Sequence, residues 1–237
     1  ESIGRNVPAL DVRQSCNGAM GSMWLAATMG TKNANIITTA DRFNQPYINR
    51  WRGDQSVFGD GATAAVLESG RGFAKIDSIN TLAENLLEGE CFSFPDEDLD
   101  NYINFEERRE YFYSEKMNMV EHYNILKNIM TECINVTLLE AGLERKNVSW
   151  VLPVISTKMR MKTQLEQFMG LDLQNSSWDF GKQTGHMGSG DQIAGLWWLL
   201  NNGLIGAGDH IIMIGGGTGF TLTVAALTIL DIPEGLG

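Results

Sequence analysis

The chain has 237 residues, of which 43% are hydrophobic and 20% charged, a composition typical of a globular protein with a sizeable core. Its 29 acidic and 18 basic residues give a formal net charge of −11, which disfavours nucleic acid as a partner because a phosphate backbone is bound by clustered Lys and Arg. No apolar run of about eighteen residues predicts a membrane span, and residues 1–8 do not resemble a signal peptide.

The cysteines and histidines form no recognisable metal-binding pattern. The cysteines are odd in number and lack zinc-site spacing, which favours a reducing, cytoplasmic compartment: Cys16, Cys91 and Cys133. The histidines are too scattered in the sequence to indicate a zinc site: His122, His186 and His210. We therefore expect neither a metal nor a bound cofactor.

The first part of the chain predicts strands around one helix. Residues 7–12 read as a buried strand with no earlier element to lie beside, so we expect a further segment ahead of Glu1. Residues 17–29 are apolar or small nearly all round, which predicts a buried helix. The next elements are expected as a strand at 35–40, a turn at 59–61 and a strand at 62–67.

The remainder of the chain alternates between strand and helix patterns. The acidity is concentrated in residues 84–110, and the run 95–98 within them predicts a solvated loop. Residues 105–141 keep the spacing of one long helix, which we expect to end at Gly142 and to pack mainly against the core. The other elements are expected as a strand at 75–82, a strand at 150–155, a helix at 158–169 ended by Gly170, a short strand at 176–180, a glycine-rich loop at 181–190, a helix at 191–202, and strands at 209–214 and 220–230.

This alternation predicts an α/β fold whose strands are buried on both faces. The last two strands follow each other directly across the glycine-rich residues 215–219, which predicts a mixed sheet. The length suits one large domain or two packed halves.

Cys16 stands where a predicted buried strand turns into a predicted buried helix. A thiol in that position faces the positive end of the helix dipole, which favours the nucleophilic thiolate. A lone cysteine is more often a small core residue, so position alone leaves both interpretations open. Cys91 and Cys133 lack such a setting and are expected to be inert.

A second segment that can carry chemistry is Gly185-His186-Met187-Gly188-Ser189-Gly190-Asp191. A histidine between glycines can approach a reacting centre without crowding. Asp191 is either a helix cap or the carboxylate that holds the imidazole in one tautomer. His122 and His210, within a predicted helix and at the start of a strand, are expected to be structural.

The loop at residues 215–219 presents bare backbone N–H groups, which suit either a phosphate or one side of an oxyanion hole. It lacks the Lys and the hydroxyl residue of a P-loop and does not precede a helix, so nucleotide binding is disfavoured. A plain structural turn is the alternative.

Four motifs occur in the order found in one enzyme family. Residues 7–18, VPALDVRQSCNG, resemble the nucleophile segment of 3-ketoacyl-ACP synthase III, and residues 57–67, VFGDGATAAVL, resemble its Phe-Gly-Asp-Gly-Ala stretch. Residues 150–153 resemble the strand ahead of the family's second catalytic motif, and residues 215–219 resemble its closing loop. The match covers nearly the whole chain, and family members carry roughly a hundred further residues ahead of it.

The sequence departs from condensing members of that family at two points. They have His-Gln-Ala-Asn where this chain has Val154-Ile155-Ser156-Thr157, so the imidazole that assists malonyl decarboxylation is missing. The segment with His186 takes the place of the family's Gly-Asn-Thr-Ser. It is similar to a variant branch with a Cys (or Ser)-His-Asp set, whose members prime polyketides or transfer acyl groups to hydroxyls.

The resemblance implies a thiolase-like, duplicated αβαβα layered fold from which the leading part of the first half is absent. Residues 1–72 would belong to the first half and residues 73–237 to the second. Carried over by residue, Cys16 is the nucleophile, His186 the general base and Asp191 its orienting acid. The backbone N–H of Cys16, with one near Gly217 or Thr218, would form the oxyanion hole.

The expected activity is acyl transfer from a coenzyme A or acyl carrier protein thioester, through Cys16, to a hydroxyl or amine of a small acceptor in secondary metabolism. The expected partners are that donor, the acceptor and a second copy of the chain in a homodimer, and no nucleic acid or membrane. Two alternatives remain open: a decarboxylative condensing enzyme that primes polyketide or fatty-acid chains, and an inactive partner subunit of a related enzyme.

Overall fold

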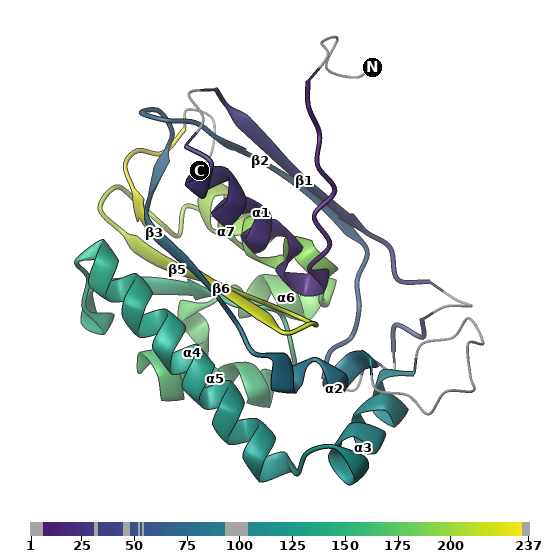
Figure 1. The fold of residues 1–237 in the computed structure, drawn as a ribbon. Coiled ribbons are helices and arrows are strands. Elements are labelled where there is room, and N and C mark those ends of the chain that lie inside the picture. The colour runs from purple at the N-terminus through teal and green to yellow at the C-terminus, as the bar shows by residue number, and fades with distance from the viewer. Residues whose placement is uncertain are drawn as a thin grey trace.

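The computed structural model describes residues 7–30, 33–44, 48–51, 53, 55–92 and 104–233. Figure 1 shows two sheets with helices packed against them. The strands are β1 (Asn35–Asp41), β2 (Gly61–Leu67), β3 (Ala74–Ala83), β4 (Val148–Leu152), β5 (His210–Gly217) and β6 (Thr221–Ile229). The helices are α1 (Gly18–Thr28), α2 (Gly89–Phe92), α3 (Phe105–Glu115), α4 (Met119–Ala141), α5 (Lys158–Met169), α6 (Trp178–Thr184) and α7 (Asp191–Asn201).

The larger sheet has the order β3-β6-β5-β4 and is mixed, as predicted, because β4 runs parallel to β5 while β3–β6 and β5–β6 are antiparallel. Its central strands are buried on both faces. Ile211 and Met213 of β5 pack in the core formed with α1 and α7, whereas Ile212 and Ile214 pack in the core formed with α4 and α5. The alternate residues of one strand therefore serve two hydrophobic layers.

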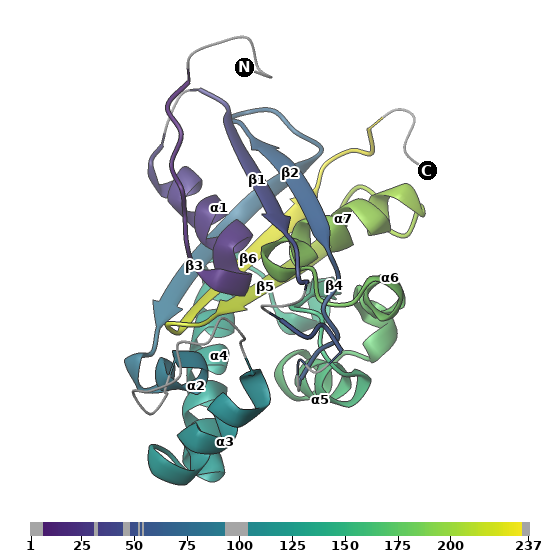
Figure 2. The same cartoon turned by 90° about the vertical axis from the view of Figure 1, so that its right-hand side faces the viewer.

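β1 and β2 form a separate antiparallel pair, and Figures 1 and 2 place α1 and α7 between this pair and the larger sheet. Ile37 is buried against the α1–α7 layer, but its neighbour Ile36 is 56% exposed. The prediction that the strands are buried on both faces is therefore wrong for this pair, because no described element covers its outer face.

The single helix expected over residues 105–141 is two helices, α3 and α4. Asn118 causes the break: its backbone is extended (φ −71°, ψ 154°), and its side-chain oxygen accepts a hydrogen bond from the N–H of Glu121 at 2.9 Å. An Asn that caps a helix competes with continuing one, and here the cap prevails. Gly142 ends α4 in the left-handed conformation (φ 67°), as predicted.

Two predicted strands are wrong. Residues 7–12 are largely exposed and form no strand within the described chain, because nothing there offers them a pairing partner. At 176–180, only Ser176 makes an isolated bridge, to Val151, and α6 begins at Trp178. The hydroxyl of Ser176 accepts the N–H of Trp178 at 3.2 Å, a turn that starts the helix instead of a strand.

The run 95–98, expected as a solvated loop, lies outside the described residues, and the described acidic residues on its two sides belong largely to α2 and α3. The glycine-rich loop expected at 181–190 begins later, because residues 181–184 belong to α6. Most other elements match their predictions apart from their boundaries. The helices expected at 158–169 and 191–202 are α5 and α7, and Gly170 ends α5 with φ 68°. The glycine-rich residues 215–217 belong to β5 rather than to a loop, and only residues 218–220 turn the chain into β6. The division of the chain at residues 72 and 73 stays a prediction.

Candidate active site

Cys16 lies in a single 3₁₀ turn (Ser15–Asn17) directly before α1. Ser15 has φ 48°, in the left-handed region that side chains rarely adopt, which costs of the order of 1 kcal/mol. Asn17, fully buried, holds this turn against β6: its amide donates to Thr223 Oγ1 at 2.9 Å and also to Thr221 Oγ1 at 3.2 Å. The strained turn that presents the thiol is therefore fixed to the central sheet.

His186 is placed by backbone pairing with the segment that precedes β2. Its N–H donates to the carbonyl of Val57 at 2.8 Å, and its carbonyl accepts the N–H of Gly59 at 2.9 Å. Gly185 makes this approach possible: its φ is 75°, and a side chain there would press on the carbonyl of Val57. A glycine is therefore needed before the histidine for steric reasons.

Asp191 is fully buried at the start of α7, and its carboxylate has three neighbours. Oδ1 accepts the N–H of Met187 at 2.8 Å, and Oδ2 accepts the N–H of Ile155 at 2.7 Å. The same Oδ2 lies 2.6 Å from Nδ1 of His186. The carboxylate therefore has one orientation, and that orientation fixes the imidazole.

The other imidazole nitrogen reaches the cysteine: Nε2 of His186 is 2.9 Å from Sγ of Cys16, although the two residues are 170 apart in sequence. Burial alone lowers the pKa of His186, but the charge of Asp191, that of Cys16 and the hydrogen bonds to both raise it well above 6.5. The geometry suits an imidazolium that donates to a thiolate on one side and to a carboxylate on the other.

Two aromatic rings surround the imidazole. The ring centroid of Phe58 lies 5.6 Å from that of His186, and the centroid of Phe43 lies 6.4 Å away. Phe58 and His186 are both buried. In so apolar a setting water screens the ion pair poorly, which strengthens its electrostatic interactions.

The residues predicted for the oxyanion hole lie against the nucleophile turn. Thr218 Oγ1 is 2.5 Å from Ser15 Oγ, and Gly217 packs so closely on Gln14 and Asn17 that a side chain would not fit. The end of β5 and the turn into β6 thus contact Ser15 and Asn17, the residues before and after Cys16. Donation by these backbone N–H groups to a substrate stays a prediction.

The other cysteines and histidines lie elsewhere. Cys133 is fully buried, and burial raises the pKa of its thiol to about 12. His210 Nδ1 is 2.9 Å from Thr228 Oγ1 across the β5–β6 pair, and His122 contacts Glu90 in a separate cluster. The side chain of Cys91 lies outside the described residues. Within the part of the chain that is described, no group of His, Cys, Asp and Glu side chains could hold a metal ion.

Three positioning contacts were not predicted from the sequence. Asn17 follows the nucleophile, and the backbone of Ile155 supports Asp191. Asp41, at the end of β1, accepts both the N–H (2.9 Å) and the hydroxyl (2.7 Å) of Ser189 and so holds the loop after His186. The only sequence signal is that polar residues stand at the ends of predicted strands and turns.

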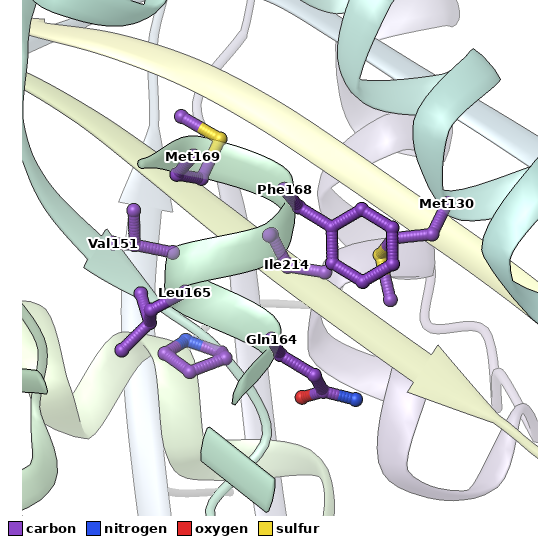
Figure 3. Close-up of a pocket in the computed structure, with 8 residues that line it drawn as sticks. Met130, Val151, Gln164, Leu165, Phe168, Met169 and Ile214 are labelled. Atoms are coloured by element: carbon purple, nitrogen blue, oxygen red, sulfur yellow. The ribbon is translucent and has the colours of Figure 1, made fainter. Parts of the chain in front are cut away.

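Two cavities lie away from these residues. An open groove of about 920 Å³ runs between α1, β2 and α7, with Met23, Val66 and Trp197 among its lining residues. Figure 3 shows a second, small cavity of about 20 Å³ between α4, α5 and the sheet, lined by apolar side chains such as Leu165 and Phe168. Neither is lined by Cys16 or His186. No helix of the described residues is long and apolar enough to cross a membrane.

The layered α/β architecture is that of a thiolase-like fold. The family model described as 3-oxoacyl-[acyl-carrier-protein] synthase III matches residues 10–83, and the model of the C-terminal part of the same family matches residues 138–229. Together they match more than half of the chain. The chain therefore belongs to the 3-oxoacyl-ACP synthase III family, as the motifs predicted.

Known proteins agree with this assignment. The chain is 23% identical to the β-ketoacyl-ACP synthase III of Clostridium perfringens strain 13 in an alignment of 238 positions that covers 95% of this chain and 69% of that protein. The structure of the acyltransferase ChlB3 matches with a TM-score of 0.90 and 29% identity, over 97% of this chain and 70% of that one. The 3-oxoacyl-ACP synthase III of Aquifex aeolicus matches in fold, with a TM-score of 0.74, 21% identity, and 95% and 68% coverage.

Proposed function

We propose that the protein is an acyltransferase that carries an acyl group on Cys16 and delivers it to a hydroxyl or amine of a small acceptor. The observation that carries this proposal is the unbroken chain of contacts from Cys16 Sγ to His186 Nε2 (2.9 Å) and from His186 Nδ1 to Asp191 Oδ2 (2.6 Å). The similarity to the acyltransferase ChlB3 supports it.

In the first step, the thiolate of Cys16 attacks the carbonyl carbon of a coenzyme A or carrier-protein thioester. The oxyanion that forms is held by backbone N–H groups of Cys16 and of Gly217 or Thr218, and one such donor typically contributes about 2.7–4 kcal/mol. As the tetrahedral intermediate collapses, the donor's C–S bond breaks. The departing thiolate takes the proton of the His186 imidazolium, and the acyl group remains on Cys16.

In the second step, His186 acts as a base. Acylation removes the negative charge of the sulfur, one of the interactions that raise the pKa of His186, so the imidazole loses its proton more readily in the acyl-enzyme than in the resting enzyme. Nε2 then accepts the acceptor's proton while the acceptor oxygen or nitrogen attacks the thioester. The Cys16 thiolate is released, and the resting ion pair forms again. A positioned base of this kind contributes about 10²–10⁴-fold.

The site favours this reaction over decarboxylative condensation. Val154 and Ile155 occupy the positions where condensing relatives are expected to have His and Gln, and the N–H of Ile155 is engaged by Asp191. Among the described side chains, His186 is the one imidazole at the thiol, since His122 and His210 have other partners. Within the described part of the chain, the thiol therefore has no second imidazole beside it to stabilise a malonyl-derived enolate.

The proposal is tested by intact-protein mass spectrometry after incubation with a panel of acyl thioesters. We expect a covalent acyl adduct on the wild-type protein and none on Cys16→Ala, with Cys133→Ala as the control that keeps the adduct. An adduct of equal yield on Cys16→Ala contradicts the proposal.

The condensing alternative predicts release of carbon dioxide when the acyl-enzyme meets malonyl carrier protein, whereas acyl transfer releases none. The third alternative, an inactive partner subunit, predicts that iodoacetamide does not label Cys16 faster than an ordinary thiol. A labelling rate that depends on His186 argues against it.

A further inference from the structure

The loop between His186 and Asp191 packs against the β1–β2 pair. Met187 leaves no room for a side chain on Gly61, the first residue of β2. Gly190 has little room for a side chain, because a threonine from each of the two strands lies against it. The strand pair therefore supports the loop at both of its ends.

The middle of the loop is held by Asp41, the last residue of β1. One oxygen of this carboxylate, Oδ2, accepts both the N–H of Ser189 at 2.9 Å and the hydroxyl of Ser189 at 2.7 Å. Gly188 allows the carboxylate to come so close: its φ is 64°, and a side chain there would collide with Asp41. Hydrogen bonds to an ionised carboxylate are stronger than those between neutral groups.

Ser189 also contacts the helix that begins beside the nucleophile. A methyl group on Gly18, the first residue of α1 and two residues after Cys16, would lie 3.0 Å from Cβ of Ser189. Ser189 therefore lies between Asp41 and the start of α1. The same side chain thus places the loop of His186 against the helix of Cys16.

We propose that Asp41 is a positioning residue that, through Ser189, sets the distance between the thiol of Cys16 and the imidazole of His186. The inference rests on the proposed function, because it concerns the thiol–imidazole pair from which acyl transfer starts. That pair has a separation of 2.9 Å, and a displacement of about 1 Å in a catalytic arrangement can cost about 10²-fold in rate.

The test is the rate at which iodoacetamide alkylates Cys16, followed by peptide mass spectrometry at about pH 6 and at about pH 10. A thiol without a cationic partner is mostly protonated at about pH 6 and ionised at about pH 10. Loss of the contact with His186 therefore slows alkylation at the lower pH and leaves the rate at the higher pH unchanged. Partial unfolding does not give this pattern, because it exposes the thiol at both pH values.

Four variants are compared with the wild-type protein: Asp41→Ala, Asp41→Asn, Ser189→Ala and Asp209→Ala. Because Oδ2 alone accepts both bonds, the single oxygen of an amide can replace it in Asp41→Asn. Asp209→Ala is the matched control. That carboxylate also accepts one backbone N–H, of Gly206 at 2.7 Å, and one hydroxyl, of Ser149 at 2.8 Å, but it stands before the first residue of β5, at the end of the strand away from the nucleophile turn.

We expect Asp41→Ala to lower the rate at the lower pH by about 10-fold to 100-fold and to leave the rate at the higher pH unchanged. Ser189→Ala should show a smaller fall, because its backbone N–H still donates to Asp41. Asp41→Asn should stay within about threefold of the wild-type protein, since both hydrogen bonds remain in neutral form. Asp209→Ala should keep the wild-type ratio of the two rates.

Three results overturn the inference: a wild-type ratio in Asp41→Ala, a fall in Asp41→Asn as large as that in Asp41→Ala, or an equal fall in Asp209→Ala. Alkylation needs neither a thioester nor an acceptor, so the expected pattern supports the role of Asp41 even where no thioester acylates the protein. A wild-type protein that reacts at the lower pH no faster than a free thiol contradicts the Cys16–His186 pair, and with it both proposals.

Discussion

Replacing Asp191 by Asn tests whether the carboxylate controls the charge of the catalytic pair. The substitution keeps the shape of the side chain but removes its negative charge. That charge is the largest of the effects that raise the pKa of His186. Without it, only the contact with Cys16 opposes the lowering effect of burial, so the pKa of His186 falls. We therefore expect the thiolate–imidazolium form of the Cys16–His186 pair to be less populated.

The magnitude follows from the three contacts of the carboxylate. The amide of Asn has only one oxygen. That oxygen can take the place of Oδ2 and accept from Ile155 and His186, or take the place of Oδ1 and accept from Met187. In either orientation the NH₂ group faces an N–H donor with which it cannot form a hydrogen bond. One buried N–H is left unsatisfied and one charge-assisted bond is lost, which together cost about 2–5 kcal/mol of unfolding free energy. For acyl transfer, we expect a loss of about 10²–10⁴-fold, the range of a positioned acid–base group.

The assay is rapid-quench measurement of the acyl-enzyme formed in a single turnover, at a temperature where circular dichroism shows Asp191→Asn to be folded. Asp179→Asn is the matched control, because that carboxylate is exposed and pairs with Lys182 alone among the described residues. Wild-type acylation and transfer rates in Asp191→Asn would refute this account of the site.

Three further predictions concern pH, the nucleophile turn and the core. The raised pKa of His186 means that the folded protein holds a proton that the unfolded chain loses above pH 6.5, so its contribution to stability is complete below that pH and is lost as pH rises through the folded pKa. Urea unfolding of the wild-type protein should show this fall, and Asp191→Asn should show a smaller one. Asn17→Ala removes the bonds that hold the turn to β6 and should cost about 1–3 kcal/mol and slow alkylation of Cys16 by iodoacetamide. Leu165→Ala should cost about 3–5 kcal/mol in urea unfolding, because the side chain is 2% exposed and already borders a cavity.

The sequence predicts this site to different degrees for different residues. His186 and Asp191 are five apart on a glycine-rich loop, so their contact is a local event that spacing suggests. The contact of Cys16 with His186 joins residues 170 apart and was expected from the resemblance to a known family, not from any periodic pattern. Local spacing cannot specify a pair whose distance is set by the packing of α1 against β5 and β6.

The wrong predictions have a common physical cause. Residues 7–12 have the composition of a strand, but a strand forms only where another chain segment accepts its hydrogen bonds. The helix break at Asn118 and the helix start at Trp178 are each decided by one hydrogen bond to a side chain: Asn118 accepts the N–H of Glu121, and Ser176 accepts the N–H of Trp178. Hydrophobic periodicity does not record such bonds, so it gives the presence of an element more reliably than its ends.

The hydrogen bonds that hold the site also explain why it belongs to the whole fold rather than to one motif. His186 is fixed by backbone pairing with Val57 and Gly59, and Asp191 by the N–H of Ile155, while the cysteine turn is fixed by threonines of β6. Each catalytic residue is therefore held by a segment distant from it in sequence. Because the thiol and the imidazole meet only when all these segments are packed, the reactivity of Cys16 depends on the packing of the segment before β2, the segment after β4, β6 and the start of α7 together. A substitution that loosens any one of these contacts should lower the thiol's reactivity before it unfolds the protein.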